Sequence, residues 1–136
     1  MSASPEASAL EAARSGIAAL DARAEHVGIA LPGGKRMAWR RFGSGPPLVL
    51  IHGGHGSWLH WIRNIEALSA AHTLLVPDLP GYGDSGPIES SGIDEIVEAV
   101  VRSLDELAGA GKDVDLCGFS FGGLVASRVA AARRHT

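Results

Sequence analysis

Near the carboxyl end of this 136-residue chain, residues 118–123 are Gly-Phe-Ser-Phe-Gly-Gly. The short apolar run of residues 114–117 precedes this turn, and the small side chains of residues 122–134 are typical of a helix that follows it. A strand that reverses sharply into a helix leaves the apical serine exposed in a strained backbone, and flanking glycines let the turn close. The pattern therefore predicts a nucleophile elbow at Ser120, with an ordinary helix-capping serine as the alternative.

Upstream of the elbow, apolar runs alternate with helical patterns. Residues 48–51 and 73–76 are continuous apolar runs, as expected of strands buried on both faces. The apolar spacing predicts one helix over residues 58–68 and an amphipathic helix over residues 93–107, with Ser91 as its cap. Strands and helices in this alternation indicate an α/β fold with a mostly parallel, doubly wound sheet.

The N-terminal part has a different pattern. Residues 5–22 carry a narrow, alanine-rich apolar stripe at helical spacing, which predicts a peripheral helix. Residues 27–42 show alternating apolar residues on either side of a Pro-Gly-Gly turn, which predicts a hairpin. We therefore divide the chain into an N-terminal helical extension, residues 1–24, and a core domain that begins at residue 25 and continues to residue 136.

Composition and charge narrow the class of protein. The chain has 46% hydrophobic residues, 20% charged residues and a net charge of −3, without the basic face of a nucleic-acid-binding domain. Its single cysteine, Cys117, excludes an internal disulfide and fits a reducing compartment. No signal peptide pattern is present, and no uncharged apolar stretch reaches the roughly 18 residues of a membrane helix. We expect a soluble, cytoplasmic protein with no nucleic-acid or membrane partner.

A second glycine-rich turn, residues 52–58, follows the strand of residues 48–51 and is His-Gly-Gly-His-Gly-Ser-Trp. The tetrahedral oxyanion of acyl transfer needs two or more hydrogen-bond donors. One donor is normally the N–H of the residue after the nucleophile, here Phe121, and another comes from the loop after the neighbouring strand. Gly54 is the first choice for that second donor and Gly53 the next. Both turns follow strands at the carboxyl edge of the sheet, where ligands bind.

Three segments together resemble the signatures of the α/β-hydrolase superfamily, in its order and at its spacing: residues 48–54, 77–85 and 118–123. The resemblance covers residues 25–135. A finer resemblance, through residues 55–58 and the Arg-Asn pair at 63–64, is to the branch of meta-cleavage-product hydrolases and related esterases.

The resemblance implies a serine hydrolase that acts on an ester, or on a related acyl or carbon–carbon bond, of a small-molecule substrate without a cofactor. Ser120 would be the nucleophile, His52 a structural part of the oxyanion loop, and Asp78 a residue that pins its turn. In this family the acid and the histidine of the triad follow the serine along the chain. We therefore expect the fold to be truncated after the elbow and its helix, and the 136 residues alone to lack full activity.

Other features of the substrate site follow from the same turns. His55 and Trp58 are candidates to line the pocket. A metal site of His52, His55 and His60 is disfavoured, because it lacks carboxylates and its spacing serves no single helix face. The serine at the elbow argues against the epoxide and haloalkane branches of the family, which use a carboxylate nucleophile.

Two alternatives are open. Gly54 and Gly56 could begin a dinucleotide-binding G-x-G-x-x-G turn, with Asp78 about 20 residues on as the ribose-binding acid. Leu59 stands where the third glycine belongs, and the elbow is then unexplained. The chain could also be a non-catalytic fragment or pseudoenzyme.

An early end of the fold also has a structural consequence. The strand that ends at Cys117 would become an edge, so we expect self-association through it. Within the strand, Cys117 itself is expected to be a small buried residue. We expect Leu124, Val125 and Val129 of the last helix to be exposed.

Overall fold

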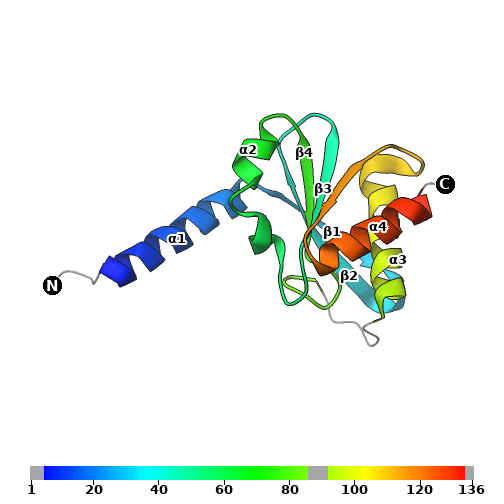
Figure 1. Cartoon of the computed structure of the whole chain (residues 1–136), viewed down its shortest axis with the longest axis horizontal. Coiled ribbons are helices and arrows are strands. Elements are labelled where there is room, and N and C mark those ends of the chain that lie inside the picture. Colours follow the sequence, from blue (N-terminus) through cyan, green and yellow to red (C-terminus); the bar gives the residue numbers. More distant parts are fainter. Residues whose placement is uncertain (1–4, 86–91, 134–136) are drawn as a thin grey trace.

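The computed structural model describes residues 5–85 and 92–133, in which five strands form one sheet with helices on both faces (Figure 1). The strands are β1 (Glu25–Leu31), β2 (Lys35–Phe42), β3 (Pro47–Ile51), β4 (Thr73–Pro77) and β5 (Asp115–Gly118), in the order β1-β2-β4-β3-β5. β1 and β2 form the predicted hairpin, and β2 pairs antiparallel with β4. β3 lies parallel to both β4 and β5. The predicted α/β class is confirmed, with β4, β3 and β5 as the parallel part of a mixed sheet.

The helical elements are α1 (Pro5–Ala22), the 3-10 turns η1 (Pro32–Gly34) and η2 (Trp58–Trp61), α2 (Ile65–Ser69), α3 (Ile93–Leu104), its π-helical continuation η3 (Asp105–Gly109), and α4 (Phe121–Arg133). The single helix predicted over residues 58–68 is wrong, because η2 and α2 are separate. Ser57 and Asn64 each occupy an N-cap position, so the chain starts two short helical segments. The predicted cap Ser91 lies outside the described residues, and the N-cap position of α3 is Gly92.

The two faces of the sheet carry two separate hydrophobic clusters. Val49 and Ile51 of β3 pack in the cluster beneath α3 and α4, which includes Val100. Leu50, between them, packs in the cluster that Ile65 of α2 covers. All five side chains are fully buried. Because successive residues of a strand point to opposite faces, the continuous apolar run of β3 serves both clusters, as predicted for a doubly wound sheet.

Helix α1 extends away from the rest of the molecule, and none of its residues is buried (Figure 1). Only its C-terminal part packs on the core, through Ile17 and Leu20. Asp21 adds an ion pair to Arg40 of β2, with 2.8 Å between Oδ1 and Nε. The helix is peripheral, as predicted, and the division of the chain at residue 25 stays a prediction. Within the described residues, no helix is long and apolar enough to cross a membrane.

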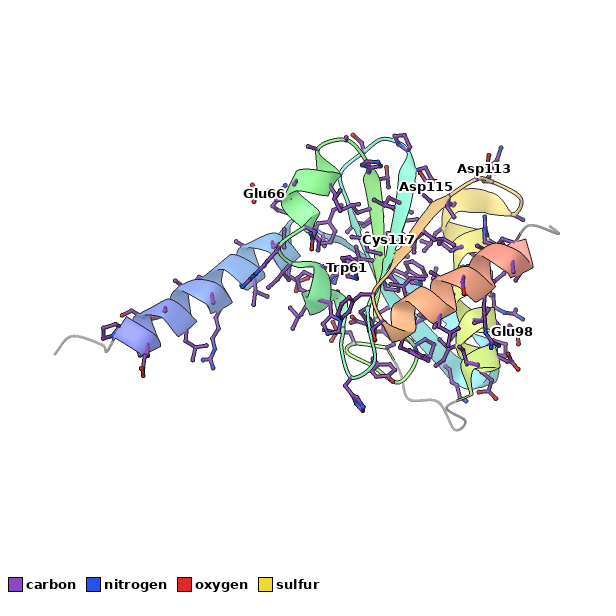
Figure 2. The ribbon with its side chains drawn as sticks, in the orientation of Figure 1. Trp61, Glu66, Glu98, Asp113, Asp115 and Cys117 are labelled. Atoms are coloured by element: carbon purple, nitrogen blue, oxygen red, sulfur yellow. The ribbon has the colours of Figure 1, made fainter. Side chains whose placement is uncertain are left out.

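Strand β5 lies at the edge of the described sheet, paired only with β3. Cys117 is exposed on this strand, so the expectation of a buried cysteine is wrong (Figure 2). Leu124 is 47% exposed, as expected, but Val125 and Val129 are fully buried. These two valines belong to the cluster shared with α3 and therefore do not face outward.

Produced alone, residues 1–136 are expected to self-associate through β5, because its outer N–H and C=O groups have no strand partner in the described sheet. Size-exclusion chromatography over a range of protein concentrations measures this self-association. A reducing buffer prevents a disulfide between the Cys117 residues of two chains. Cys117→Lys places a charge on the same edge and should shift the protein toward the monomer. A wild-type monomer at every concentration would contradict the expectation.

Candidate active site

Ser120 lies at the turn between β5 and α4 with a φ of 57°, in the left-handed region of the backbone. Few residues other than glycine adopt this conformation, and such strain is concentrated at functional sites. The side chain is exposed, and the Ser120 carbonyl accepts hydrogen bonds from the N–H groups of Gly123 and Leu124 at 2.9 and 3.4 Å. The predicted strand–turn–helix geometry is therefore present, and the catalytic role of the serine stays a prediction.

The two glycines that flank Ser120 allow very close backbone contacts. A Cβ atom on Gly118 would lie 2.2 Å from the carbonyl oxygen of Gly122, and one on Gly122 would lie 2.2 Å from that of Ile51. The Phe119 N–H also donates to the Ile51 carbonyl at 3.1 Å. The first turn of α4 consequently rests directly on the end of β3, which brings the elbow beside the loop that follows β3.

That loop carries the predicted oxyanion donors. A Cβ atom on Gly54 would lie 3.9 Å from Cβ of Phe121, so the loop and the first residue of α4 are neighbours. The N–H groups of Gly54 and Phe121 have no acceptor among residues 5–85 and 92–133. The Gly53 N–H, in contrast, donates to Nδ1 of His60 at 3.1 Å. Of the two predicted glycines, Gly54 is thus the one with an available donor.

His52 joins the loops that follow β3 and β4. Its Nε2 accepts a hydrogen bond from the Leu79 N–H at 2.9 Å, so the proton lies on Nδ1, which donates to the Gly53 carbonyl at 2.7 Å. The ring is fully buried. Burial lowers the pKa of His52, while the Gly53 carbonyl and Asp78 oppose that effect. The neutral imidazole therefore acts as a structural link, as the family resemblance implies.

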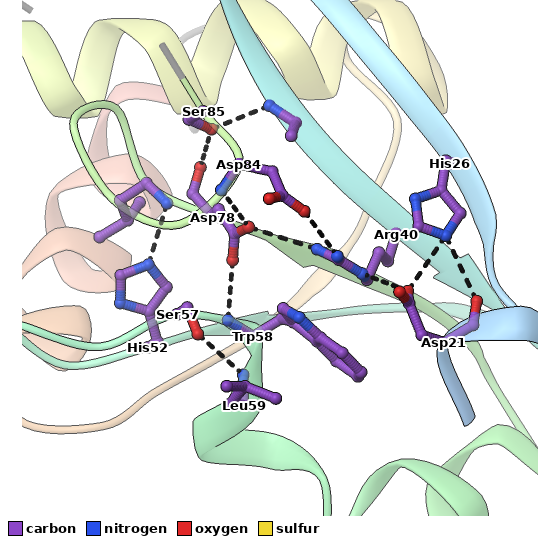
Figure 3. Close-up of polar contacts among 12 residues, drawn as sticks. Asp21, His26, Arg40, His52, Ser57, Trp58, Leu59, Asp78, Asp84 and Ser85 are labelled. Atoms are coloured by element: carbon purple, nitrogen blue, oxygen red, sulfur yellow. Dashed lines mark hydrogen bonds and ion pairs between the residues drawn. The ribbon is translucent and has the colours of Figure 1, made fainter. Parts of the chain in front are cut away.

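A network of charged groups centred on Asp78 fixes the same loops (Figure 3). The buried carboxylate of Asp78 accepts hydrogen bonds from the N–H groups of Trp58 at 2.8 Å and Asp84 at 2.9 Å. The same carboxylate pairs with the guanidinium of Arg40 at 3.2 Å. Burial disfavours the charge on Arg40, but Asp21 and Asp84 raise its pKa overall. Asp78 thus pins its turn, as predicted, and both of its carboxylate oxygens are engaged within the chain.

The two predicted pocket residues lie in different environments. His55 is exposed, with a φ of 59° at the apex of the loop, and stays a candidate. Trp58 is only 5% exposed, and Phe42 lies 6.4 Å away between ring centroids. The guanidinium of Arg40 lies 4.4 Å from the centre of the Trp58 ring. In the described structure the network around Arg40 holds Trp58 in the core, and its role in lining the pocket stays a prediction.

Comparison with known families agrees with this geometry. Residues 48–136 match the family model described as the alpha/beta hydrolase family. The chain belongs to this family. The match begins at β3 and includes the loop with Gly54, the Asp78 turn and the Ser120 elbow.

Several relatives of this α/β hydrolase are known. The dihydrolipoyllysine-residue acetyltransferase component of the acetoin cleaving system of Pseudomonas putida is 39% identical over 101 residues, which cover 72% of this chain and 27% of the relative. The pimeloyl-[acyl-carrier protein] methyl ester esterase of Vibrio campbellii is 38% identical over 92 residues, 68% of this chain and 34% of the relative. A crystal structure of an epoxide hydrolase from Vigna radiata superposes with a TM-score of 0.74 at 29% identity, over 83% of this chain and 37% of the other. The α/β hydrolase chain therefore spans 27–37% of the length of these relatives.

Gly122→Ala is expected to destabilise this α/β hydrolase by about 3 kcal/mol, because the new methyl group would collide with the backbone of β3. Gly123→Ala is the matched control, since a Cβ atom there lies at an ordinary 3.5 Å from the Gly118 carbonyl oxygen. Urea denaturation of both variants measures the difference. Equal stability of the two variants would contradict the tight contact between α4 and β3.

Acidification is expected to destabilise the hydrolase through His52. The unfolded chain takes up a proton at the ordinary pKa of 6.5, whereas the folded chain, with its lowered pKa, does not. This contribution to stability is complete above pH 6.5 and is lost as the pH falls toward the folded pKa. Thermal unfolding between about pH 8 and 5 measures the effect, and His52→Gln, which does not titrate, should reduce the slope. An NMR titration with a His52 pKa at or above 6.5 would show that the prediction is wrong.

Proposed function

We propose that this α/β hydrolase cleaves ester substrates through a covalent acyl-enzyme, with Ser120 as the nucleophile. The observation that carries the proposal is an exposed serine at φ 57°, beside two N–H groups without acceptors. One group is that of Gly54, in the loop after β3, and the other is that of Phe121, at the start of α4. Unpaired backbone donors next to a strained serine are suited to the developing oxyanion of acyl transfer.

In the proposed reaction, a base removes the proton of the Ser120 hydroxyl while Oγ attacks the carbonyl carbon of the ester. The N–H groups of Gly54 and Phe121 bind the oxyanion, and its collapse releases the alcohol, which takes the proton from the base. Water then hydrolyses the acyl-serine by the same steps and regenerates the hydroxyl.

The base and its supporting acid are proposed to lie outside these 136 residues. Within residues 5–85 and 92–133, no imidazole or carboxylate is hydrogen-bonded to Ser120. The chain spans only about a third of the length of the esterase relative, and the family order places the acid and the histidine after the serine.

The chemistry of a serine favours ester cleavage over epoxide opening. A serine oxygen that opened an epoxide would form an ether, and water does not readily hydrolyse an ether. The same oxygen forms an ester with an acyl group, which water can remove. The esterase relative therefore supports the proposal more directly than the epoxide hydrolase structure does. Carbon–carbon bond hydrolysis, which the finer sequence resemblance suggests, uses the same oxyanion donors and is the second candidate.

In a protein that also contains the proposed base and acid, Ser120→Ala is expected to abolish covalent labelling by a fluorophosphonate probe. The reason is that labelling requires the Ser120 Oγ to displace fluoride from phosphorus. Ester hydrolysis should fall by at least roughly 10⁴-fold. Ser127→Ala is the matched control, since its hydroxyl lies on the same helix and donates only to the Leu124 carbonyl. Mass spectrometry of the labelled peptide identifies the modified residue. Continued labelling of Ser120→Ala would exclude this serine as the nucleophile.

A further inference from the structure

The loop that carries Gly54 packs against the imidazole of the exposed His60. The Gly53 N–H donates to His60 Nδ1 at 3.1 Å, and the Gly53 carbonyl accepts the Gly56 N–H at 3.2 Å. A Cβ atom on Gly56 would lie 2.1 to 2.7 Å from three atoms of the His60 ring. The ring thus occupies the space that a side chain at Gly56 would need, and the turn closes on it.

The same imidazole also contacts the elbow. The ring of Phe119, the residue before Ser120, meets His60 edge to face with centroids 5.7 Å apart. A Cβ atom on Gly53 would lie 3.1 Å from Phe119 and 3.5 Å from His60. His52 contacts His60 from a third side, with centroids 6.0 Å apart. His60 therefore bridges the loop and the elbow, which are the two sides of the proposed oxyanion site.

We propose that His60 is a positioning residue that fixes the oxyanion loop, an inference that rests on the function proposed above. By accepting the Gly53 N–H, Nδ1 holds the His52–Gly53 peptide group, one residue before the Gly54 N–H, in one orientation. The Gly54 N–H, which has no acceptor in the described chain, is thereby kept for the oxyanion. Preorganised donors of this kind act mainly on the transition state, and small displacements of them are costly.

The hydrogen bond also indicates the tautomer of the ring. Because Nδ1 accepts the Gly53 N–H, the ring proton lies on Nε2 in this arrangement. In this state Nε2 cannot take the proton of Ser120, so His60 acts through the position of the loop and not as the catalytic base.

The first test compares His60→Leu with His60→Asn in the protein that also contains the proposed base and acid. The fluorophosphonate probe serves as the substrate analogue. Leucine removes the acceptor, and the maximal rate of Ser120 labelling should fall about 10²-fold while the apparent affinity for the probe changes little. Asparagine places Oδ1 near the position of Nδ1 and should recover most of the rate. His72→Leu, which removes an imidazole bonded to the Leu68 carbonyl, is the control and should label like the wild type.

The second test uses the contact with Gly56. Gly56→Ala should displace the His60 ring and reduce the labelling rate similarly, because the methyl group and the ring cannot share the same space. In a His60→Ala background the same change should have little further effect, since the ring is gone.

The outcomes separate the two proposals. If wild-type Ser120 is not labelled, the proposed function fails. If it is labelled and His60→Leu lowers only the melting temperature or the probe affinity, with the maximal rate unchanged, the positioning role of His60 is overturned. Failure of asparagine to recover the rate, or additive effects of the Gly56 and His60 changes, would overturn it as well.

Discussion

The site depends on the close approach between the first turn of α4 and the end of β3. Gly118 and Gly122 have no side chains, so the backbone after β5 can rest against the carbonyl of Ile51. This contact forces the chain to reverse within a few residues, and Ser120 takes the strained position at the apex. Any larger residue at Gly122 would separate the elbow from the loop that holds Gly54. The same contact therefore determines how α4 packs on the sheet and where the residues of the site lie.

Two buried polar residues hold the remaining loops to this elbow. His52 uses both ring nitrogens to connect the loop after β3 with Leu79, at the start of the turn after β4. Asp78 accepts hydrogen bonds from both of these loops and neutralises Arg40. Since buried polar groups are costly unless they are satisfied, these interactions favour a single arrangement of the loops.

These contacts hold together the part of the proposed catalytic site that lies in the described residues. The described residues supply an exposed serine and two unpaired donors, and His60 joins the loop to the elbow. No described residue is bonded to the Ser120 hydroxyl to activate it. The open edge of β5 and the exposed Leu124 lie next to the elbow, so this unpaired surface adjoins the proposed site.

The sequence alone determined the features that depend on local spacing. The apolar run of β3, the hairpin, the peripheral α1 and the turn at Ser120 follow from side-chain period and glycine placement, which neighbouring residues set. The tertiary structure decided what depends on distant contacts. Trp58 is aromatic and next to a glycine-rich turn, so its pattern fits a pocket as well as the core. Its packing against Phe42 and Arg40 in the folded chain places it in the core.

The sequence did not indicate the contacts that Arg40 and His60 make, and the physical reason is the same for both. Arg40 shares its side of β2 with the buried Phe42, which indicates an inward position, but its acidic partners come from helix α1 and from the turn after β4. His60 follows Gly53 by seven residues, and no periodicity indicates that a turn will close around its ring. Sequence period specifies which elements form, whereas hydrogen bonds between loops depend on how those elements are brought together in the folded chain.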